Sequence, residues 1–259
     1  MKHNVIILTS GLSGSSVLTG LIARAGYWTG DSTHKKRDYD TFENSELIEL
    51  NRRLFNQAGY SGNYLVEFPP RAMKDIAELA GKVTDPAFAT FIAKCNRHQP
   101  WIWKDPRLWF TIRFWKPYLD LNNCKFVLLT RSIMQSWVSQ ILRRQIVSYA
   151  YSKNYEASIQ RSITEFLEEN NLAFTQVGYE NLIVHPVETI RKLNEFLETH
   201  LTIDDLRQVY HRPLYKNPRT SWANHVKALA IYAKNYSERI DFSQATPALR
   251  EHSRAAGEH

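Results

Sequence analysis

The sequence predicts an α/β fold, a three-layer sandwich in which a central, mostly parallel sheet lies between helices, with additional helices around it. Two apolar runs, at residues 5–8 and 125–130, are typical of strands buried on both faces of such a sheet. Weaker strand patterns occur at 101–103 and 174–177, and apolar residues recur at helical spacing between these segments. Strands and helices that alternate in this way favour parallel pairing.

The remaining elements follow from apolar spacing and from chain breakers. The charged segment 31–40 is predicted to be a loop, and 64–66 a short strand or a buried loop. The elements are expected to form one domain over residues 1–242, followed by a flexible tail at 243–259. Helices are predicted at 17–25, 45–57, 71–80, 85–97, 107–115, 131–149, 156–170, 186–200 and 221–240.

The composition favours a negatively charged partner. The chain has 33 Lys and Arg against 26 Asp and Glu, which gives a formal net charge of +7. An excess of this size suits an anionic ligand, an anionic polymer or a membrane surface. A nucleic-acid partner is not expected, because no basic run with interleaved aromatic residues lies on a known nucleic-acid-binding scaffold.

Cysteine usage and hydropathy indicate the compartment. The two cysteines, Cys95 and Cys124, are far apart and lack the spacing of a zinc site, so two free thiols in a reducing compartment are expected. No apolar run approaches the ~18 residues of a membrane helix. The sequence therefore predicts a soluble, cytoplasmic protein without a membrane span, whose oligomeric state is open.

The segment that follows the first strand predicts an anion-binding loop. Gly11 and Gly14 allow a tight turn and a close approach to a ligand, and Ser13, Ser15 and Ser16 add hydroxyl donors. The loop amides and the start of the next helix together form a cradle for an anion. The Gly-Lys-Ser/Thr ending of a Walker A loop is missing, and a simple connecting turn would show the same residues.

A second anion site is predicted at the end of the strand at 125–130. Arg131 follows this strand directly, and Ser139 lies eight residues later on the next helix. Ligands bind at the carboxyl ends of parallel strands, where an Arg can hold a phosphate with two hydrogen bonds and a Ser can add a third. A surface Arg in an ion pair and an ordinary helical Ser are the alternative.

Together these motifs resemble those of the P-loop sulfotransferase family, in particular its bacterial carbohydrate-type and tyrosylprotein-type branches. The resemblance covers about residues 5–197, and each motif is weak alone but stronger in this order. The matching segments are Gly11-Leu12-Ser13-Gly14-Ser15-Ser16, Phe42-Glu43-Asn44, Trp103-Lys104-Asp105-Pro106-Arg107, the pair Arg131 and Ser139, and Tyr179-Glu180-Asn181-Leu182 before Pro186.

The resemblance implies transfer of a sulfuryl group from 3′-phosphoadenosine 5′-phosphosulfate (PAPS), without a metal, to a hydroxyl or amine of an unidentified acceptor such as a carbohydrate or small metabolite. The loop 11–16 would hold the 5′-phosphosulfate, and Arg131 with Ser139 the 3′-phosphate. Leu12 stands where the family usually carries Lys or Arg. Either Lys104 takes the whole role of that cation, or the enzyme is slow, or the protein binds the nucleotide without catalysis.

The resemblance also suggests catalytic residues. Lys104 is assigned to the leaving-group oxygen or the sulfuryl group, and Glu43 to the general base. An ion pair with Asp105 or another acid is the alternative for Lys104, and a helix N-cap or a surface position is the alternative for Glu43. His98 is a rival base.

Arg219, in a late basic stretch, is expected to bind the nucleotide by analogy with the family, although solvated surface charge explains it equally simply. Arg107 is a candidate for the nucleotide or for an anionic acceptor.

A P-loop nucleotide kinase is the competing enzyme class. It predicts a Lys in the loop and an acid for Mg²⁺, and the loop lacks the Lys.

Overall fold

The computed structural model describes residues 2–37, 39–209 and 222–241. Its central sheet has four parallel strands in the order β4-β1-β5-β6. The strands are β1 (Asn4–Leu8), β4 (Ile102–Lys104), β5 (Cys124–Thr130) and β6 (Phe174–Gly178). All four strand predictions are confirmed, and so is the α/β class.

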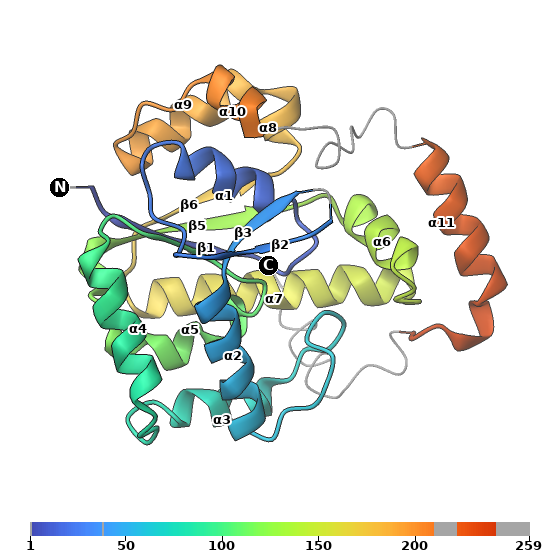
Figure 1. Cartoon of the computed structure of the whole chain (residues 1–259). Helices are drawn as coiled ribbons and strands as arrows, with labels where there is room; N and C mark the ends of the chain where they lie inside the picture. The colour runs from blue at the N-terminus through green and yellow to red at the C-terminus, as the bar shows by residue number, and fades with distance from the viewer. Residues whose placement is uncertain (1, 38, 210–221, 242–259) are drawn as a thin grey trace.

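Helices cover both faces of this sheet (Figure 1). The upper face in the figure carries α1 (Ser15–Ala23), α8 (Asn181–Val184), α9 (Pro186–Leu197) and α10 (Ile203–Val209). The lower face carries α2 (Ser45–Gln57), α3 (Pro70–Glu78), α4 (Pro86–Arg97), α5 (Leu108–Trp115) and α7 (Tyr149–Glu169). Short 3-10 helices span Lys116–Tyr118, Leu121–Asn123 and Tyr236–Glu238.

The side chains of β1 divide the core between the two faces. Val5 and Ile7 belong to the cluster under α1 and α9, whereas Ile6 and Leu8 belong to the larger cluster on the other side. Successive residues of a strand point to opposite faces, so a continuous apolar run fits a strand that is covered on both sides.

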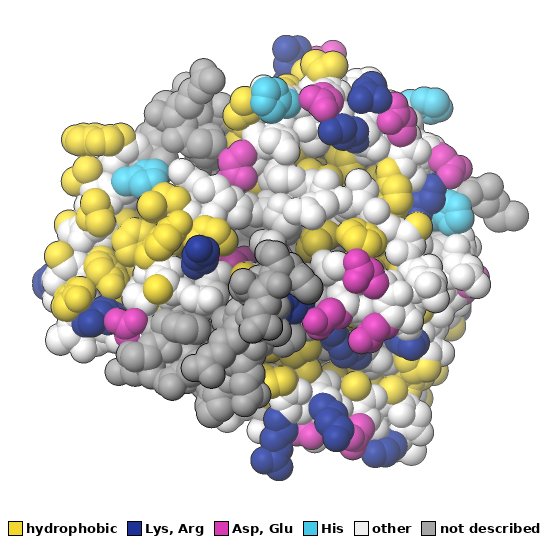
Figure 2. All heavy atoms as spheres, turned by 180° about the vertical axis from the view of Figure 1, so that it is seen from behind, with side chains coloured by type: hydrophobic (Ala, Val, Ile, Leu, Met, Phe, Trp, Pro, Cys, Tyr) yellow, Lys and Arg dark blue, Asp and Glu magenta, His cyan; other side chains and the backbone are white. Residues whose placement is uncertain are grey.

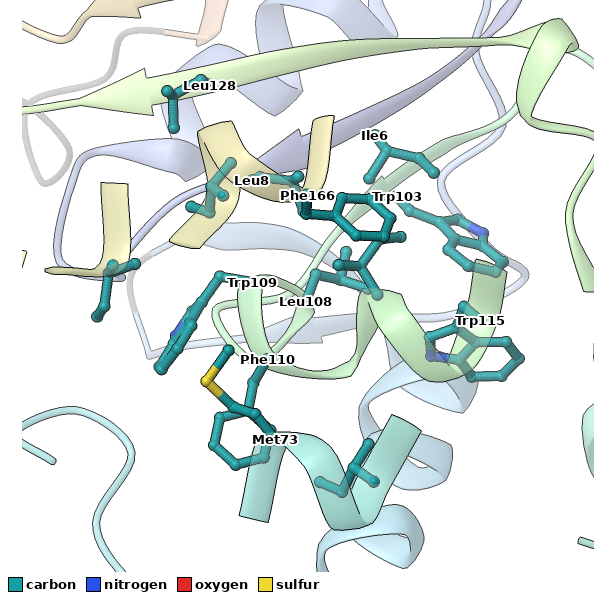
Figure 3. Packing of buried hydrophobic residues seen from close by; sticks show 14 of the residues in the cluster. Ile6, Leu8, Met73, Trp103, Leu108, Trp109, Phe110, Trp115, Leu128 and Phe166 are labelled. Atoms are coloured by element: carbon teal, nitrogen blue, oxygen red, sulfur yellow. The ribbon is translucent and has the colours of Figure 1, made fainter. Parts of the chain in front are cut away.

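The larger cluster is rich in aromatic side chains (Figure 3). Its Trp residues pack against Phe and Leu side chains rather than facing solvent, which agrees with the size of aromatic groups and their contribution to cores. Four Trp residues of this cluster are almost fully buried: Trp101, Trp103, Trp109 and Trp115.

The prediction of a loop at 31–40 is wrong. The segment contains β2 (Thr33–Lys35), which pairs in antiparallel orientation with β3 (Asp40–Asn44). Side chains close this hairpin: Thr33 Oγ1 donates to Asp40 Oδ2 at 2.6 Å, and Thr41 Oγ1 donates to the carbonyl of His34 at 2.6 Å. These contacts join residues that the polar composition alone assigns to a loop.

The single helix predicted at 131–149 is also wrong. Helix α6 (Ile133–Leu142) ends early, and Arg144 adopts a left-handed conformation with φ 64°. Helix α7 then begins after Ser148, whose hydroxyl accepts a hydrogen bond from the amide of Tyr151 at 3.1 Å. An N-cap serine of this kind starts a new helix.

Helices α6 and α11 (Trp222–Lys234) pack together beyond the carboxyl ends of the strands, at the right of Figure 1. Figure 2 shows hydrophobic side chains gathered over this edge. They include the exposed Trp222, Val226 and Leu229, which follow one face of α11. Within the described ranges, no helix combines the length and apolarity that crossing a membrane requires.

Candidate functional site

A cavity of about 380 Å³ lies where the carboxyl ends of β4, β1 and β5 meet. The loop 11–16 lines its centre, because β1 is flanked by the other two strands. Lys104 enters from the end of β4, and Arg131 enters from the end of β5. The strand order therefore brings the two predicted anion sites into one cavity, as expected at this edge of a parallel sheet.

The loop after β1 turns through three left-handed residues. The φ angles are 87° at Gly11, 51° at Leu12 and 80° at Gly14. Gly14 is required for a second reason, because a Cβ atom there would lie 2.2 Å from the ring of Tyr179. Helix α1 begins directly after Gly14, and no side chain caps it. The amides of its first turn therefore have no side-chain acceptor and lie next to the loop that lines the cavity.

Arg131 is bonded to the loop itself. Its Nη1 donates to the carbonyl of Leu12 at 2.6 Å and to Ser139 Oγ at 3.2 Å, and its guanidinium lies 5.2 Å from the centre of the Tyr179 ring. Its Nε is buried and has no hydrogen-bond partner in the described part of the protein. Burial also lowers the pKa of Arg131. A buried, incompletely bonded guanidinium is what an oxyanion would satisfy.

Lys104 and Glu43 form an ion pair on the other side of the loop. The Lys104 side chain is 2% exposed and that of Glu43 is 13% exposed. Lys104 Nζ also donates to the carbonyl of Thr41 at 3.3 Å and, at the outer limit for a hydrogen bond, to Ser16 Oγ at 3.5 Å. These contacts hold an ammonium and a carboxylate side by side at the edge of the anion-binding loop.

Lys104 forms an ion pair with an acid other than Asp105, namely Glu43, whereas the helix cap and the contacts of Asp105 involve other residues. Asn44, not Glu43, caps α2, since its Oδ1 accepts from the amide of Glu46 at 2.9 Å. Asp105 accepts from Asn51 Nδ2 at 3.0 Å and from Arg107, rather than from Lys104. Both Lys104 and Glu43 are therefore directed to the cavity.

The backbone before Glu43 helps to direct it. Phe42 adopts a left-handed φ of 54°, and its amide donates to Asp40 Oδ1 at 2.7 Å. The Phe42 ring packs over Gly20 of α1, where a Cβ atom would lie 2.6 Å from that ring. A non-glycine residue held in this conformation is often found beside a functional group.

The match to a protein family agrees with this geometry. The model described as "Sulfotransferase family" matches residues 12–204, which include residues 12–16 of the loop, Lys104 and Arg131. The chain belongs to the sulfotransferase family. No curated protein matches the sequence at a significant level.

Two solved sulfotransferase domains resemble this sulfotransferase over its whole length. The domain from the curacin biosynthetic pathway has a TM-score of 0.52 at 15% identity, with 100% of this chain and 99% of that chain covered. The domain from the Synechococcus PCC 7002 olefin synthase has a TM-score of 0.50 at 17% identity, with 100% and 97% covered. At these identities the likeness establishes the fold.

Several residues of the sulfotransferase cavity were not identified from the sequence as ligand-binding. Arg52 lines the cavity one helical turn after Ile48, and Arg143 lines it one helical turn after Ser139. This i, i+4 spacing is the signal that could have found them. Tyr64 and Tyr179 also line it: the sequence analysis names Tyr179 only as part of the segment before Pro186, without a binding role, and no local signal marks Tyr64.

Glu156 lies behind the loop and was also missed. The Ser10 hydroxyl donates to its carboxylate, across 146 positions of sequence. Burial raises the pKa of Glu156 to about 7, although the bond from Ser10 and the charge of Arg131 act against this rise. Only the packing of α7 under the loop brings these residues together.

Among the predicted residues that the structure describes, His98 does not line the cavity. His98 follows α4, where its ring stacks on Trp28 at 4.7 Å. Arg219 lies outside the described residues. Elsewhere in the described ranges, no group of three or more His, Cys, Asp or Glu residues is arranged to hold a metal ion; metal independence stays a prediction.

Proposed function

We propose that this sulfotransferase uses PAPS as its donor and transfers the sulfuryl group to a hydroxyl or amine of an acceptor. The observation that carries the proposal is the hydrogen bond from Arg131 to the loop carbonyl of Leu12, with Arg131 Nε left unpaired among the described residues. One cavity thus offers two oxyanion sites, one for each phosphate position of a 3′,5′-bisphosphorylated adenosine.

In the proposed reaction the acceptor oxygen or nitrogen attacks the sulfur in line with the bond that breaks. The bond between sulfur and the bridging oxygen of the 5′-phosphate breaks, and PAP leaves with its electron pair. The acceptor proton passes to Glu43, while Lys104 stabilises the charge that develops on the bridging oxygen. Positioning and electrostatics supply the acceleration, as in phosphoryl transfer.

The replacement of the usual loop cation by Leu12 supports a second candidate, a protein that binds PAPS without transferring the sulfuryl group. The buried ammonium of Lys104 beside Ser16 supports the catalytic reading, because it supplies a cation at the same loop. Release of PAP from bound PAPS, in the presence of a panel of sugars, phenols and hydroxy acids, separates the two candidates.

The donor is tested by thermal unfolding with PAP, ADP and ATP at equal concentrations. At equal concentration, the ligand that binds the folded state more tightly raises the unfolding temperature more. PAP is expected to raise it most, since only PAP carries a 3′-phosphate for Arg131 and Ser139. Equal stabilisation by ADP, or an effect of ATP that EDTA abolishes, would contradict the proposal and favour a nucleotide kinase.

A further inference from the structure

Two cations of the cavity have no part in the proposed transfer. Arg52 and Arg107 line the cavity on the side of β4 and α2, across the loop from Arg131. Because β1 separates β4 from β5 in the sheet, a nucleotide held between the loop and Arg131 lies away from this side. The side next to Glu43 and Lys104 is where an acceptor must bind.

Arg107 is held in a fixed orientation. Its Nη1 donates to Asp105 Oδ1 at 2.9 Å, and the fully buried Asp105 is anchored in turn by Asn51. The guanidinium lies 5.1 Å from the centre of the Tyr64 ring. Among the described residues only Nη1 of this guanidinium is engaged in a hydrogen bond, so its other N–H groups remain for a ligand.

Arg52 has a free charge. It is exposed and has no ion-pair partner in the described part of the chain, whereas the adjacent Arg53 pairs with Glu49 and Asp85. Its place on α2, one turn after Ile48, directs it to the cavity. Burial raises the pKa of the Tyr64 hydroxyl, and Arg107 and Arg52 both act against this rise, so both guanidiniums lie near that ring.

The cationic side chains of the cavity extend beyond the proposed donor position. The described lining of the cavity contains one acid, Glu43, and these six Lys and Arg residues: Lys36, Arg52, Lys104, Arg107, Arg131 and Arg143. Arg131, Arg143 and Lys104 lie around the proposed nucleotide position. The bisphosphorylated donor leaves Arg52 without a counter-charge, and it leaves Arg107 with N–H groups that its ion pair to Asp105 does not use. Oxyanions are the groups that guanidinium binds best.

We propose that Arg52 and Arg107 form a subsite for an anionic group of the acceptor, a carboxylate or a phosphate, separate from the hydroxyl or amine that receives the sulfuryl group. The inference rests on the proposed function. Helix α2 rises about 10 Å between Ser45, next to the base, and Arg52. Helical side chains lean back towards the N-terminus, so the subsite suits an acceptor of about the size of a sugar.

The test uses the whole chain saturated with PAP, which occupies the donor site. Calorimetric titrations compare D-glucuronate with D-glucose for a carboxylate, and D-glucose 6-phosphate with D-glucose for a phosphate. At least one anionic probe is expected to bind about tenfold more tightly than glucose. The Arg52→Gln variant is expected to lose most of this preference, while the matched Arg53→Gln variant on the same helix keeps it.

Arg52 is chosen because it is exposed, whereas a change at Arg107 would leave the buried Asp105 without its partner. Affinity for PAP should be equal in the wild type and in both variants. Three results would overturn the subsite while PAP still binds. The charged and neutral probes could bind equally, or neither anionic probe could bind measurably. The third result is the same loss of preference in the Arg52→Gln and Arg53→Gln variants. If PAP itself does not bind, the proposed function fails and the subsite fails with it.

Discussion

Lys104 has an almost completely buried ammonium that contacts Glu43, Ser16 and the carbonyl of Thr41. A lysine side chain is rarely buried unless its charge is paired, and here the carboxylate of Glu43 provides the pair. The hydrogen bonds hold the ammonium at one place beside the loop. A cation held in advance where charge develops lowers a barrier without reorganising during the reaction.

We expect Lys104→Met to lower the rate of PAP release from PAPS by about 100- to 1000-fold at saturating donor, the usual effect of removing one such donor. Affinity for PAP should change little, because the contact strengthens in the transition state. Lys125→Met, which removes an ion pair to Glu198, should keep full activity. Wild-type turnover of Lys104→Met would remove the assignment.

Glu156 predicts a pH dependence of stability. Its pKa is about 7 in the folded protein because of burial, against 4.5 in its ordinary state. Between these values the folded protein binds a proton that the unfolded chain does not, so this group makes the protein less stable as the pH rises from about 4.5 to about 7.

Replacing Glu156 by Gln removes this penalty while keeping an acceptor for Ser10. Urea unfolding at several pH values measures the difference in free energy of unfolding between variant and wild type. This difference should move in favour of the variant by on the order of 3 kcal/mol as the pH rises from below 4.5 to above 7. A difference that is constant with pH would contradict the raised pKa of Glu156.

At the scale of elements, the loop between β1 and α1 depends on close contact with the residue that follows β6. The Tyr179 ring lies against Gly14 on one side and over Arg131 on the other. The loop, Arg131 and the end of β6 therefore form one packed unit. Displacing any of them should disturb the proposed donor site.

Gly14→Ala and Gly26→Ala form a matched pair that tests this contact. Both glycines are left-handed, with φ 80° and 92°, but only at Gly14 would a Cβ atom meet another side chain. Each change should cost about 1–2 kcal/mol of stability from the backbone alone. Gly14→Ala should in addition weaken PAP binding more than tenfold, while Gly26→Ala leaves it unchanged. Equal PAP affinity in both variants would show that Tyr179 does not position the site.

On the scale of the whole molecule, the positive charge is concentrated where the strands end. The net charge is +7, and the described lining of the cavity contains six Lys and Arg residues and one acid. A cavity lined by charges of one sign concentrates the field and attracts ligands of opposite charge. Salt screens such attraction over about 8–10 Å at physiological ionic strength.

PAP affinity should therefore fall several-fold as NaCl rises from 50 to about 300 mM, a range in which screening shortens markedly. AMP, which has a single phosphate, should lose less affinity over the same range. Titrations of both nucleotides at constant pH provide the comparison. The same salt dependence for both would mean that the 3′-phosphate does not reach the cationic side of the cavity.

The sequence by itself determined the class of the fold and predicted the loop that lines the centre of the cavity. Two local patterns carry this prediction: the continuous apolar strands at 5–8 and 125–130, and the Gly/Ser loop after the first strand. Each pattern determines the structure of its own segment. Parallel pairing then places both strand ends at one edge, whatever the details of packing. The boundaries at 31–40 and 131–149 failed because a hairpin and a helix break depend on side-chain hydrogen bonds that composition does not reveal.

Only the tertiary structure decided which distant residues surround that site. Ser10 and Glu156 are 146 positions apart, and Tyr64 reaches the cavity through a loop held by Tyr155, whose hydroxyl donates to the Tyr64 carbonyl at 2.5 Å. Arg52 lines the cavity and has no ion pair with any residue that the structure describes, while Arg53 beside it pairs with Asp85. Such differences arise from packing of elements far apart in the chain, which no local pattern encodes.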